Sequence, residues 1–471
     1  MYELQGITPN MESPPDAISA AQARNLILQG NAPKNLNVRN PDDAIYGTRL
    51  DLRNQANLKV LPDGLTVWGH LDLSGCPGLQ ALPPDLKAEG LNLEGCTGLQ
   101  IFPEGIEVGY LYLDCCTALV SIPRKLSLKG ILKINHCERL KALPDELSVG
   151  GNVWIINCPA LETLPSKLTA SRILNLANCP HITTFPAATI GELRIGVNTG
   201  IREFPVNALF ESIYLEDWHW LTDLPSGLSI PGYHSLEHCI NLRTVPSDLK
   251  AKHLHLRHCS RLVELPPNLM IRGVLELTGC TSLTKLPPNL KDDYSEPHSD
   301  KYFTSLSGCT GLTELPDNLF AYKLNVSNCT ALKSLPVGFR VGEYLDLSGC
   351  TALTALPEKM SVGYGLCLAR CKNLTKLPED LQVGHEIDIA DTGIKELPIS
   401  LSHVRLLWNG VEIDERIAFR PESLTLPEIL QETNTARQTV LIQRFGVERF
   451  MEEIRTQGID FMWNQRLDWG K

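Results

Sequence analysis

Hydrophobic and polar residues alternate in short stretches that recur along most of the chain. One copy, residues 345–365, reads LDLSGCTALTALPEKMSVGYG, and similar copies begin at Leu71 and Leu91. In each copy a Leu-x-Leu stretch is followed by a cysteine, a leucine and then a Leu-Pro or Phe-Pro pair. Side chains alternate along an extended chain, so the two leucines face one side and the residue between them faces the other. The pattern therefore predicts one short strand per copy, with one buried face.

The proline of each copy recurs from Pro62 to Pro398 in steps of 19 to 21 residues, apart from one step of 29. A unit of this length cannot bury its own apolar side, so successive units must stack as coils. The residue before a proline is pushed out of the helical region. We therefore expect the far side of each coil to be extended or polyproline-like, with at most a turn of 3₁₀ helix.

The repeats resemble the leucine-rich repeats, whose consensus matches Leu345, Leu347, Cys350 and Leu353, with cysteine at the usual asparagine position. The Leu-Pro tail is similar to the short bacterial subtype of this family. The resemblance covers about residues 48–409. It implies an α/β fold, namely a right-handed, horseshoe-shaped leucine-rich-repeat solenoid with a parallel β-sheet on the concave face. It also implies a mostly non-helical convex side and small helical caps.

The repeat divides the chain into three predicted regions. Residues 1–47 are expected to comprise a disordered start, to about residue 15, and a helical cap over residues 16–29. Residues 48–409 form the array. Residues 410–471 are expected to form a second helical cap, with one helix running from a capping box at Thr425 to Phe445 and another over residues 447–457. Residues 420–450 are also similar to a stretch in bacterial proteins of unknown function.

Two insertions interrupt the regular spacing, at residues 39–47 and 291–302. Both carry an acidic pair and residues that favour turns, which predicts solvated loops; binding loops are the alternative interpretation.

Thirteen of the fifteen cysteines recur at one position of the repeat, and we call them the ladder cysteines. They are Cys76, Cys96, Cys116, Cys137, Cys158, Cys179, Cys239, Cys259, Cys280, Cys309, Cys329, Cys350 and Cys371. The same position is filled elsewhere by Gln55, Asn198, Trp218, Asp391 and Asn409. Cysteine is small, mostly apolar and a weak donor, which suits a buried turn. Even spacing gives no pair a preferred partner, so we expect reduced thiols in a reducing compartment, with disulfides or metal as the alternatives.

Composition narrows the possible partners. The 471 residues carry a net charge of −11, with 21% charged and 43% hydrophobic residues, which is typical of a folded acidic protein. An acidic balance argues against nucleic acid and anionic membranes. No apolar run reaches the roughly 18 residues of a membrane span, and the amino terminus lacks the layout of a secretory signal. We therefore expect a cytoplasmic protein or, alternatively, one secreted into a host cell without a cleavable signal peptide.

The sequence contains no Gly-rich phosphate loop, no Gly-x-Ser-x-Gly and no His-Glu-x-x-His, so the usual signatures of nucleotide and hydrolase chemistry are absent. Some bacterial leucine-rich-repeat effectors carry a ubiquitin-ligase domain with a Cys-x-Asp nucleophile. No cysteine here is followed by x-Asp. We therefore predict no enzymatic activity and no cofactor, while a role as a binding effector in a host cell stays open.

The repeats differ mainly at the residue between the two inward positions of the strand. In chain order this outward residue is Asp51, Asp72, Asn92, Tyr112, Lys133, Trp154, Asn175, Arg194, Tyr214, Ser235, His255, Glu276, Ser305, Asn325, Asp346, Cys367, Asp388 and Arg405. Aromatic and cationic residues cluster in the middle, whereas Asp, Asn and Ser at the outer coils indicate a solvated face. Aromatic residues and arginine are enriched at the centres of protein interfaces.

The prediction is therefore a protein–protein interaction scaffold that binds an unidentified protein partner through the middle of its concave face. Its predicted partner-binding residues are Tyr110, Tyr112, Lys133, Trp154, Arg194, Tyr214, Glu216, Tyr233, His253, His255 and Arg257. We expect loss of the Trp154 or Tyr214 ring to weaken binding and to leave stability nearly unchanged. The alternative interpretation is that these exposed side chains only cover the sheet and have no binding role.

A metal-binding module is a further alternative, because half of the twelve histidines lie between His219 and His258. His253 and His255 share a strand face, and His238 and His258 share a turn position. Two imidazoles on one face are only half of a zinc or nickel site, so no metal site is assigned.

Overall fold

The computed structural model describes residues 16–40, 47–202, 209–224, 226, 232–267, 269–271, 274–288, 303–317, 319 and 321–459. The chain divides into two compact units, Met1–Cys239 with Asp248–Ala251, and Ile240–Ser247 with Lys252–Lys471. The expected disordered start and most of both inserted loops lie outside the described residues.

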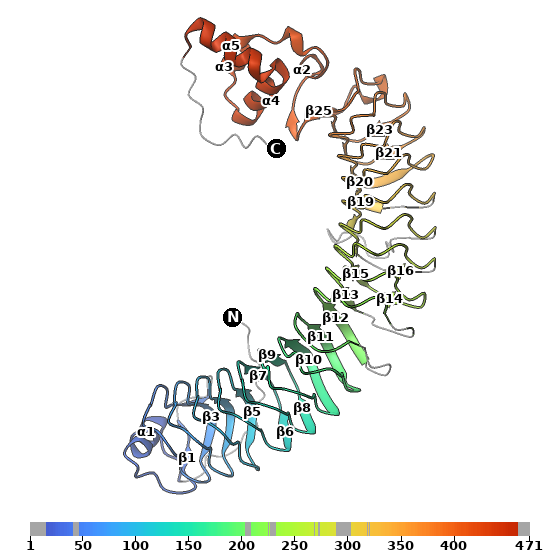
Figure 1. Cartoon of the computed structure of the whole chain (residues 1–471). Coiled ribbons are helices and arrows are strands. Elements are labelled where there is room, and N and C mark those ends of the chain that lie inside the picture. Colours follow the sequence, from blue (N-terminus) through green and yellow to red (C-terminus); the bar gives the residue numbers. More distant parts are fainter. Residues whose placement is uncertain are drawn as a thin grey trace. The chain divides into compact units, whose positions relative to one another are not determined.

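Each coil of the first unit contributes a strand to a parallel ladder (Figure 1). The outward residues predicted above are Cα partners from one coil to the next, as in Asp51 with Asp72, Lys133 with Trp154, and Arg194 with Tyr214. The leucines on either side of them are buried, for example Leu71 and Leu73. The alternation in the sequence thus predicted the register of this ladder correctly. We call its outward side the strand face.

A second parallel ladder lies on another side of the coils, where we expected extended or polyproline-like chain without predicting that it would pair. It pairs Lys125 through Leu128 with Glu146 through Val149, and these in turn with the start of the strand that begins at Lys167. The Leu-x-Val tail of the repeat alternates, so Leu147 and Val149 are buried while Ser148 is exposed. Extended chain at this spacing pairs its backbone amides with those of the next coil, which makes it β-strand.

The elements of the first unit are, in order, α1 (Ala20–Leu28), β1 (Asn37–Val38), β2 (Thr48–Asp51), β3 (Thr66–Asp72), β4 (Lys87–Asn92), β5 (Glu107–Tyr112), β6 (Lys125–Leu128), β7 (Leu132–Asn135), β8 (Glu146–Val149), β9 (Val153–Ile156), β10 (Lys167–Ala177), β11 (Thr189–Ile195), β12 (Leu209–Leu215), β13 (Tyr233–Ser235) and β14 (Lys250–Ala251).

The elements of the second unit are β15 (His253–His255), β16 (Met270–Ile271), β17 (Leu275–Glu276), β18 (Phe303–Ser305), β19 (Ala321–Asn325), β20 (Arg340–Asp346), β21 (Ser361–Val362), β22 (Gly365–Cys367), β23 (Gln382–Val383), β24 (Glu386–Asp388), η1 (Ile399–Leu401), β25 (Arg405–Trp408), β26 (Val411–Glu412), α2 (Glu415–Phe419), η2 (Pro421–Ser423), α3 (Leu426–Gln431), α4 (Thr435–Phe445) and α5 (Val447–Gln457).

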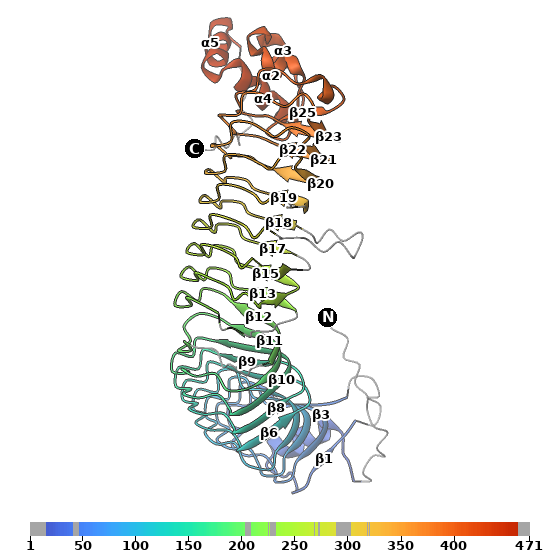
Figure 2. The ribbon, with the colours of Figure 1, turned by 90° about the vertical axis from the view of Figure 1, so that its right-hand side faces the viewer.

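In the second unit the strands again pair in parallel in the order of the sequence, as Figure 2 shows for β17, β18 and β19. The last of them, β25, also pairs antiparallel with β26 through a turn at Asn409 and Gly410, which both have positive φ. One outward position was wrong: Arg405 is the partner of Glu386, and Leu407 is the partner of Asp388. The parallel ladder therefore ends in a hairpin rather than in another complete coil.

Each ladder cysteine follows a residue in the left-handed region, such as Asn157 (φ 54°) before Cys158 or His258 (φ 58°) before Cys259. Asparagine, aspartate and glycine tolerate this region best. By the same rule Asn198 (φ 57°), Asp391 (φ 54°) and Asn409 (φ 50°) are turn residues. The cysteine position was therefore assigned wrongly at all three. In the first two coils it belongs to the residues that follow, Thr199 and Thr392, and at Asn409 the chain enters the hairpin of β25 and β26 instead.

All thirteen ladder cysteines are fully buried, and all fifteen cysteines are free. Their thiols donate to carbonyl oxygens of the preceding coil, as from Cys76 to Leu52 (3.1 Å) and from Cys350 to Val326 (3.2 Å). Burial raises the pKa of Cys96 and of Cys239 to about 12, so these thiols keep the proton that they donate. In these turns the thiol therefore gives a hydrogen bond to a backbone carbonyl that faces the interior, and burying the cysteine side chain costs little free energy.

Helix α1 begins with a capping box between Ser19 and Gln22 and contacts the first coil. Its Arg24 donates from Nε to the carbonyl oxygen of Asp51 at 2.9 Å. Strand β1 pairs in parallel with Thr66 and Val67 of β3, so the chain just before the array adds a strand to it. A capping role for α1 stays a prediction.

The carboxyl-terminal helices differ from the sequence prediction in two ways. The long helix expected from Thr425 is two helices, α3 and α4, because Glu432 is extended and Asn434 accepts from the amide of Arg437 as a new N-cap. Thr425 makes no capping hydrogen bond; Glu428, the other half of the expected box, pairs with Arg416 of α2 instead.

These helices contact the last strands of the second unit. Arg444 of α4 lies over the Trp408 ring at 4.0 Å and donates to the carbonyl oxygens of Ile417 and Ala418. That these helices act as a cap stays a prediction. No helix in the described ranges is both long and apolar enough to cross a membrane.

Candidate interaction surface

Five rings lie outward on the strand face of the first unit, and we call them the aromatic surface: Tyr110, Tyr112, Trp154, Tyr214 and Tyr233. Tyr112, Trp154 and Tyr214 belong to the outward row predicted from the sequence, together with Lys133 and Arg194. Tyr110 and Tyr233 each lie two residues earlier on their strands, and Glu216 lies two residues after Tyr214. All five rings are half-buried, as expected for side chains that stand on a sheet beside neighbours of similar size.

Arg194, Tyr214 and Tyr233 form a continuous stack across three successive strands. The guanidinium of Arg194 lies 4.9 Å from the centre of the Tyr214 ring, and the Tyr214 and Tyr233 ring centres are 5.3 Å apart with an interplanar angle of 15°. Arg194 is also hydrogen-bonded through Nε to Glu192 of its own strand. Burial, with a smaller contribution from Glu192, raises the pKa of Tyr214, so this phenol stays neutral. The stack is partly a structural feature, because each ring supports the next.

Lys133 forms an ion pair with Asp114, with 2.8 Å between Nζ and Oδ2. The hydrogen bond that Lys133 donates to Asp114 raises the pKa of Lys133, so the ammonium stays charged. The Asp114 side chain is only 5% exposed, whereas that of Lys133 is 42% exposed. A buried carboxylate needs a compensating charge, and Lys133 supplies it. Sequence reasoning assigned Lys133 to the partner and missed Asp114, although Asp114 lies two residues after Tyr112 on the same outward side.

Tyr110 lies flat against the next coil, where a side chain would not fit. A Cβ built on Gly130 would be 2.1 Å from Cε1 of Tyr110, so glycine there makes room for the ring. The Tyr110 ring also lies 6.3 Å from that of His70. Tyr112 is half-buried, and burial raises its pKa. Tyr112 therefore presents an uncharged ring.

Trp154 differs from the other rings. Its strand neighbours are Lys133 and Asn175, but within the described part of the chain it makes no hydrogen bond, ion pair or ring contact of its own. A large ring that the fold does not use is the strongest candidate for an anchor in an interface.

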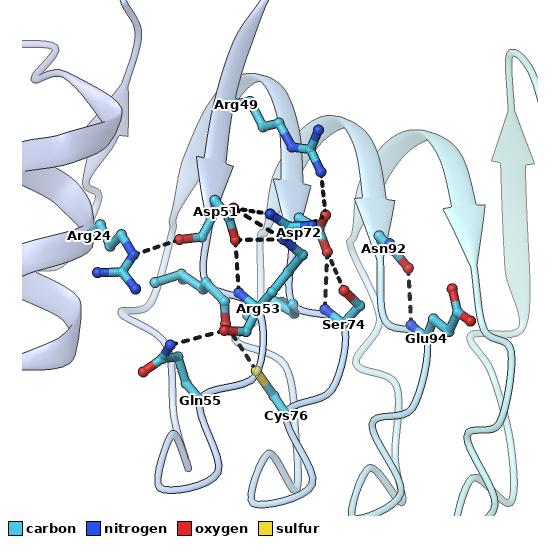
Figure 3. A network of polar contacts seen from close by, with 12 residues as sticks. Arg24, Arg49, Asp51, Arg53, Gln55, Asp72, Ser74, Cys76, Asn92 and Glu94 are labelled. Atoms are coloured by element: carbon cyan, nitrogen blue, oxygen red, sulfur yellow. Dashed lines mark hydrogen bonds and ion pairs between the residues drawn. The ribbon is translucent and has the colours of Figure 1, made fainter.

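At the outer coils the outward residue has a structural role. In the first coils Asp51, Asp72 and Asn92 each accept a hydrogen bond from the backbone amide two residues on (Figure 3). Arg49 and Arg53 surround the two aspartates, with Arg49 Nη2 2.7 Å from Oδ2 of Asp72. Asp72 is 5% exposed, so its interpretation as a solvated residue was wrong.

The same arrangement occurs in the second unit. Glu276, Asn325, Asp346 and Asp388 accept from the amide two residues on. Asp388 is 6% exposed and accepts further hydrogen bonds from the amides of Asn409 and Gly410, so it too was wrongly taken as solvated. A carboxylate or amide oxygen at this position closes the turn that follows the strand. We call coils with this bond capped and the coils from Tyr112 to Tyr214 uncapped.

The remaining predicted residues, His253, His255 and Arg257, belong to the second unit. His253 accepts from the amide of Val274 through Nδ1 at 3.1 Å. Burial lowers the pKa of His255, against an opposing effect of Glu276, so this imidazole is neutral near pH 7. Among the residues described, no three His, Cys, Asp or Glu side chains gather closely enough to hold a metal ion.

No family model matches the chain, and no curated protein matches it. Among solved structures the chain is similar to YopM from Yersinia enterocolitica WA-314, at 18% identity and a TM-score of 0.22, over 82% of this chain and 94% of that one. It is also similar to the protein in a TLR13–ssRNA13 complex, at 14% identity and a TM-score of 0.15, over 74% and 79%. Such distant likenesses carry no functional argument. The fold is a leucine-rich-repeat solenoid. The repeat consensus and the register of the strands from coil to coil both show it.

Proposed function

We propose that this chain is a non-catalytic scaffold that binds a protein partner on the aromatic surface. The observation that supports this most is Trp154, a half-buried ring on the strand face with no partner of its own in the described residues. Tyr, Trp and Arg dominate the binding energy of protein interfaces, and they act from the centre of the contact. The tyrosines of the aromatic surface lie on both sides of Trp154 along the ladder.

The chemistry of this surface supports binding rather than turnover. Its side chains are rings and charges already paired, as in Lys133 with Asp114 and Arg194 with Glu192. Neither pair places a nucleophile beside a base, which is the arrangement that group-transfer chemistry needs.

The ladder cysteines support a reducing location, such as the cytoplasm. Their thiols donate hydrogen bonds to backbone carbonyls, and oxidation would remove those donors.

The test compares capture of proteins by the immobilised wild type, Trp154→Ala and Ile101→Ala, read by quantitative mass spectrometry. Ile101 is the matched control, because it is a large apolar side chain, 62% exposed, that lies outside the aromatic surface. A true partner should be depleted about tenfold or more by Trp154→Ala and not by Ile101→Ala. Identical capture by all three proteins would reject the aromatic surface as the binding site.

A further inference from the structure

The cations beside the aromatic surface are already occupied within the fold. Lys133 is held 2.8 Å from the buried Asp114, and Arg194 is hydrogen-bonded to Glu192 while it lies over the Tyr214 ring. A cation that balances a buried carboxylate can bind a second anion only by leaving that carboxylate. The carboxylate would then be buried without a partner, which costs free energy. Neither cation is therefore a free site for an acidic group.

The charge that is left over has the opposite sign. Glu216 is exposed beside the Tyr214 strand and has no ion pair within the described residues. The chain as a whole carries a net charge of −11. An acidic segment or a nucleic acid would thus meet paired cations and an unpaired carboxylate, which gives no electrostatic gain.

Apart from Glu216, the side chains that remain for contact are uncharged. Trp154 cannot ionise, and Tyr112 and Tyr214 stay neutral because burial disfavours the phenolate. Uncharged rings gain most from apolar and aromatic groups that displace water from them.

Resting on the proposed function, we infer that the partner docks at Trp154 through a segment of uncharged apolar or aromatic side chains. Lys133 is then a positioning residue, because it neutralises Asp114 and keeps the surface neutral, and it does not contact an acidic group of the partner.

The probe for the test is a library of short random peptides displayed on phage and selected on the full-length wild type. Enriched peptides are synthesised, and their Kd is measured at about 50 mM and about 500 mM NaCl, since salt on this scale screens exposed charge pairs. We expect sequences rich in uncharged apolar and aromatic residues, with a Kd that changes less than about threefold with salt. Trp154→Ala should raise Kd about thirtyfold, which corresponds to about 2 kcal/mol.

Variants of the ion pair separate positioning from contact. Lys133→Met alone leaves Asp114 buried without its cation, so it should lower Tm and weaken peptide binding. The double variant Asp114→Asn, Lys133→Met has no charge to balance and should bind within about threefold of wild type. Lys133→Arg, which keeps the pair, should also bind like wild type.

The outcomes divide cleanly. Three results would overturn the inference: acidic enriched peptides, a Kd that rises about tenfold or more with salt, or loss of binding in the double variant. If these peptides still needed Trp154 for binding, the proposed function would stand. No enriched peptide, or peptides that bind Trp154→Ala as well as wild type, would overturn both.

Discussion

Capped and uncapped coils have the same backbone path, but the residue at the outward position of the strand has a different role in each. In capped coils an Asp, Asn or Glu accepts the amide two residues on, as at Asp72 and Asp346. In uncapped coils that position carries Tyr112, Lys133, Trp154, Asn175, Arg194 or Tyr214, and none of these side chains accepts that amide. The fold explains the residue in capped coils. In uncapped coils it explains Lys133 by its ion pair and Tyr214 by its stack, and it leaves Trp154 unexplained. Similar sequence variation along a solenoid therefore has to be divided into structural and functional positions before a surface is proposed.

The largest effect should come from removing a capping carboxylate. Asp388→Ala leaves the amides of Ala390, Asn409 and Gly410 without their acceptor, in a place that is almost fully buried. We expect a loss of about 3 kcal/mol in the free energy of unfolding, and a lower Tm in thermal unfolding. Hydrogen exchange at Asn409 and Gly410 should accelerate at the same time.

Asp388→Asn is the matched control, because its side-chain oxygen can still accept one of these amides, and it should lose less than the alanine variant. Equal stability of wild type and Asp388→Ala would mean that the capping bond is not what selects the residue, and the division into two kinds of coil would fail.

A smaller effect should separate two rings within the uncapped coils. Tyr214→Ala removes the contacts with both Arg194 and Tyr233, so we expect a loss of about 1–2 kcal/mol in stability, contrary to the expectation from sequence. Trp154→Ala removes no such contact and should change stability by no more than about 0.5 kcal/mol. Chemical denaturation of the two variants beside wild type measures the difference. Equal losses would show that Trp154 also supports the fold.

The smallest effect should come from an exposed cap. The hydrogen bond from Arg53 lowers the pKa of Asp51 to about 2, from 3.8. A carboxylate whose pKa is lower in the folded than in the unfolded protein stabilises the fold. This contribution is complete above the pKa of the unfolded protein and is lost as the pH falls from about 4 through about 2. Asp51 is well exposed, so solvent screening limits this contribution to about 0.5 kcal/mol.

The difference in unfolding free energy between wild type and Asp51→Asn should therefore shrink between about pH 5 and about pH 2.5. A constant difference would contradict the ion pair with Arg53 as its source.

The array could be predicted from sequence because each coil repeats the same inward residues. Leu345, Leu347 and Leu353 are buried as the alternation required, and the outward row keeps its register from coil to coil. The extended course of the far side was expected, but its pairing into a second ladder was missed because the spacing of prolines shows only that the chain is not helical. The break before Asn434 was missed because one helix was drawn through residues 433–435, although threonine and asparagine are weak helix formers and asparagine is a favoured N-cap.

The candidate surface could be predicted only in part. The outward direction of Trp154 and Tyr214 follows from alternation alone. The pairing of Lys133 with Asp114, and of Arg194 with Glu192, depends on side-chain conformations that no spacing rule gives. The buried aspartates were misjudged for a related reason: charge alone suggested solvent, whereas the backbone amides nearby required an acceptor.

The ring of Tyr110 lying on Gly130 has a consequence for how such an array can change over time. The same fit occurs where the rings of Tyr322 and Tyr344 lie against Gly342 and Gly365. In each case a bulky residue in one coil depends on a glycine about twenty residues later, so the two positions can change only together. A single coil is therefore not a freely interchangeable module. Duplicating or excising one would leave a ring facing a neighbour that has no room for it, and recombination in this gene should be tolerated most readily when adjacent coils move as pairs.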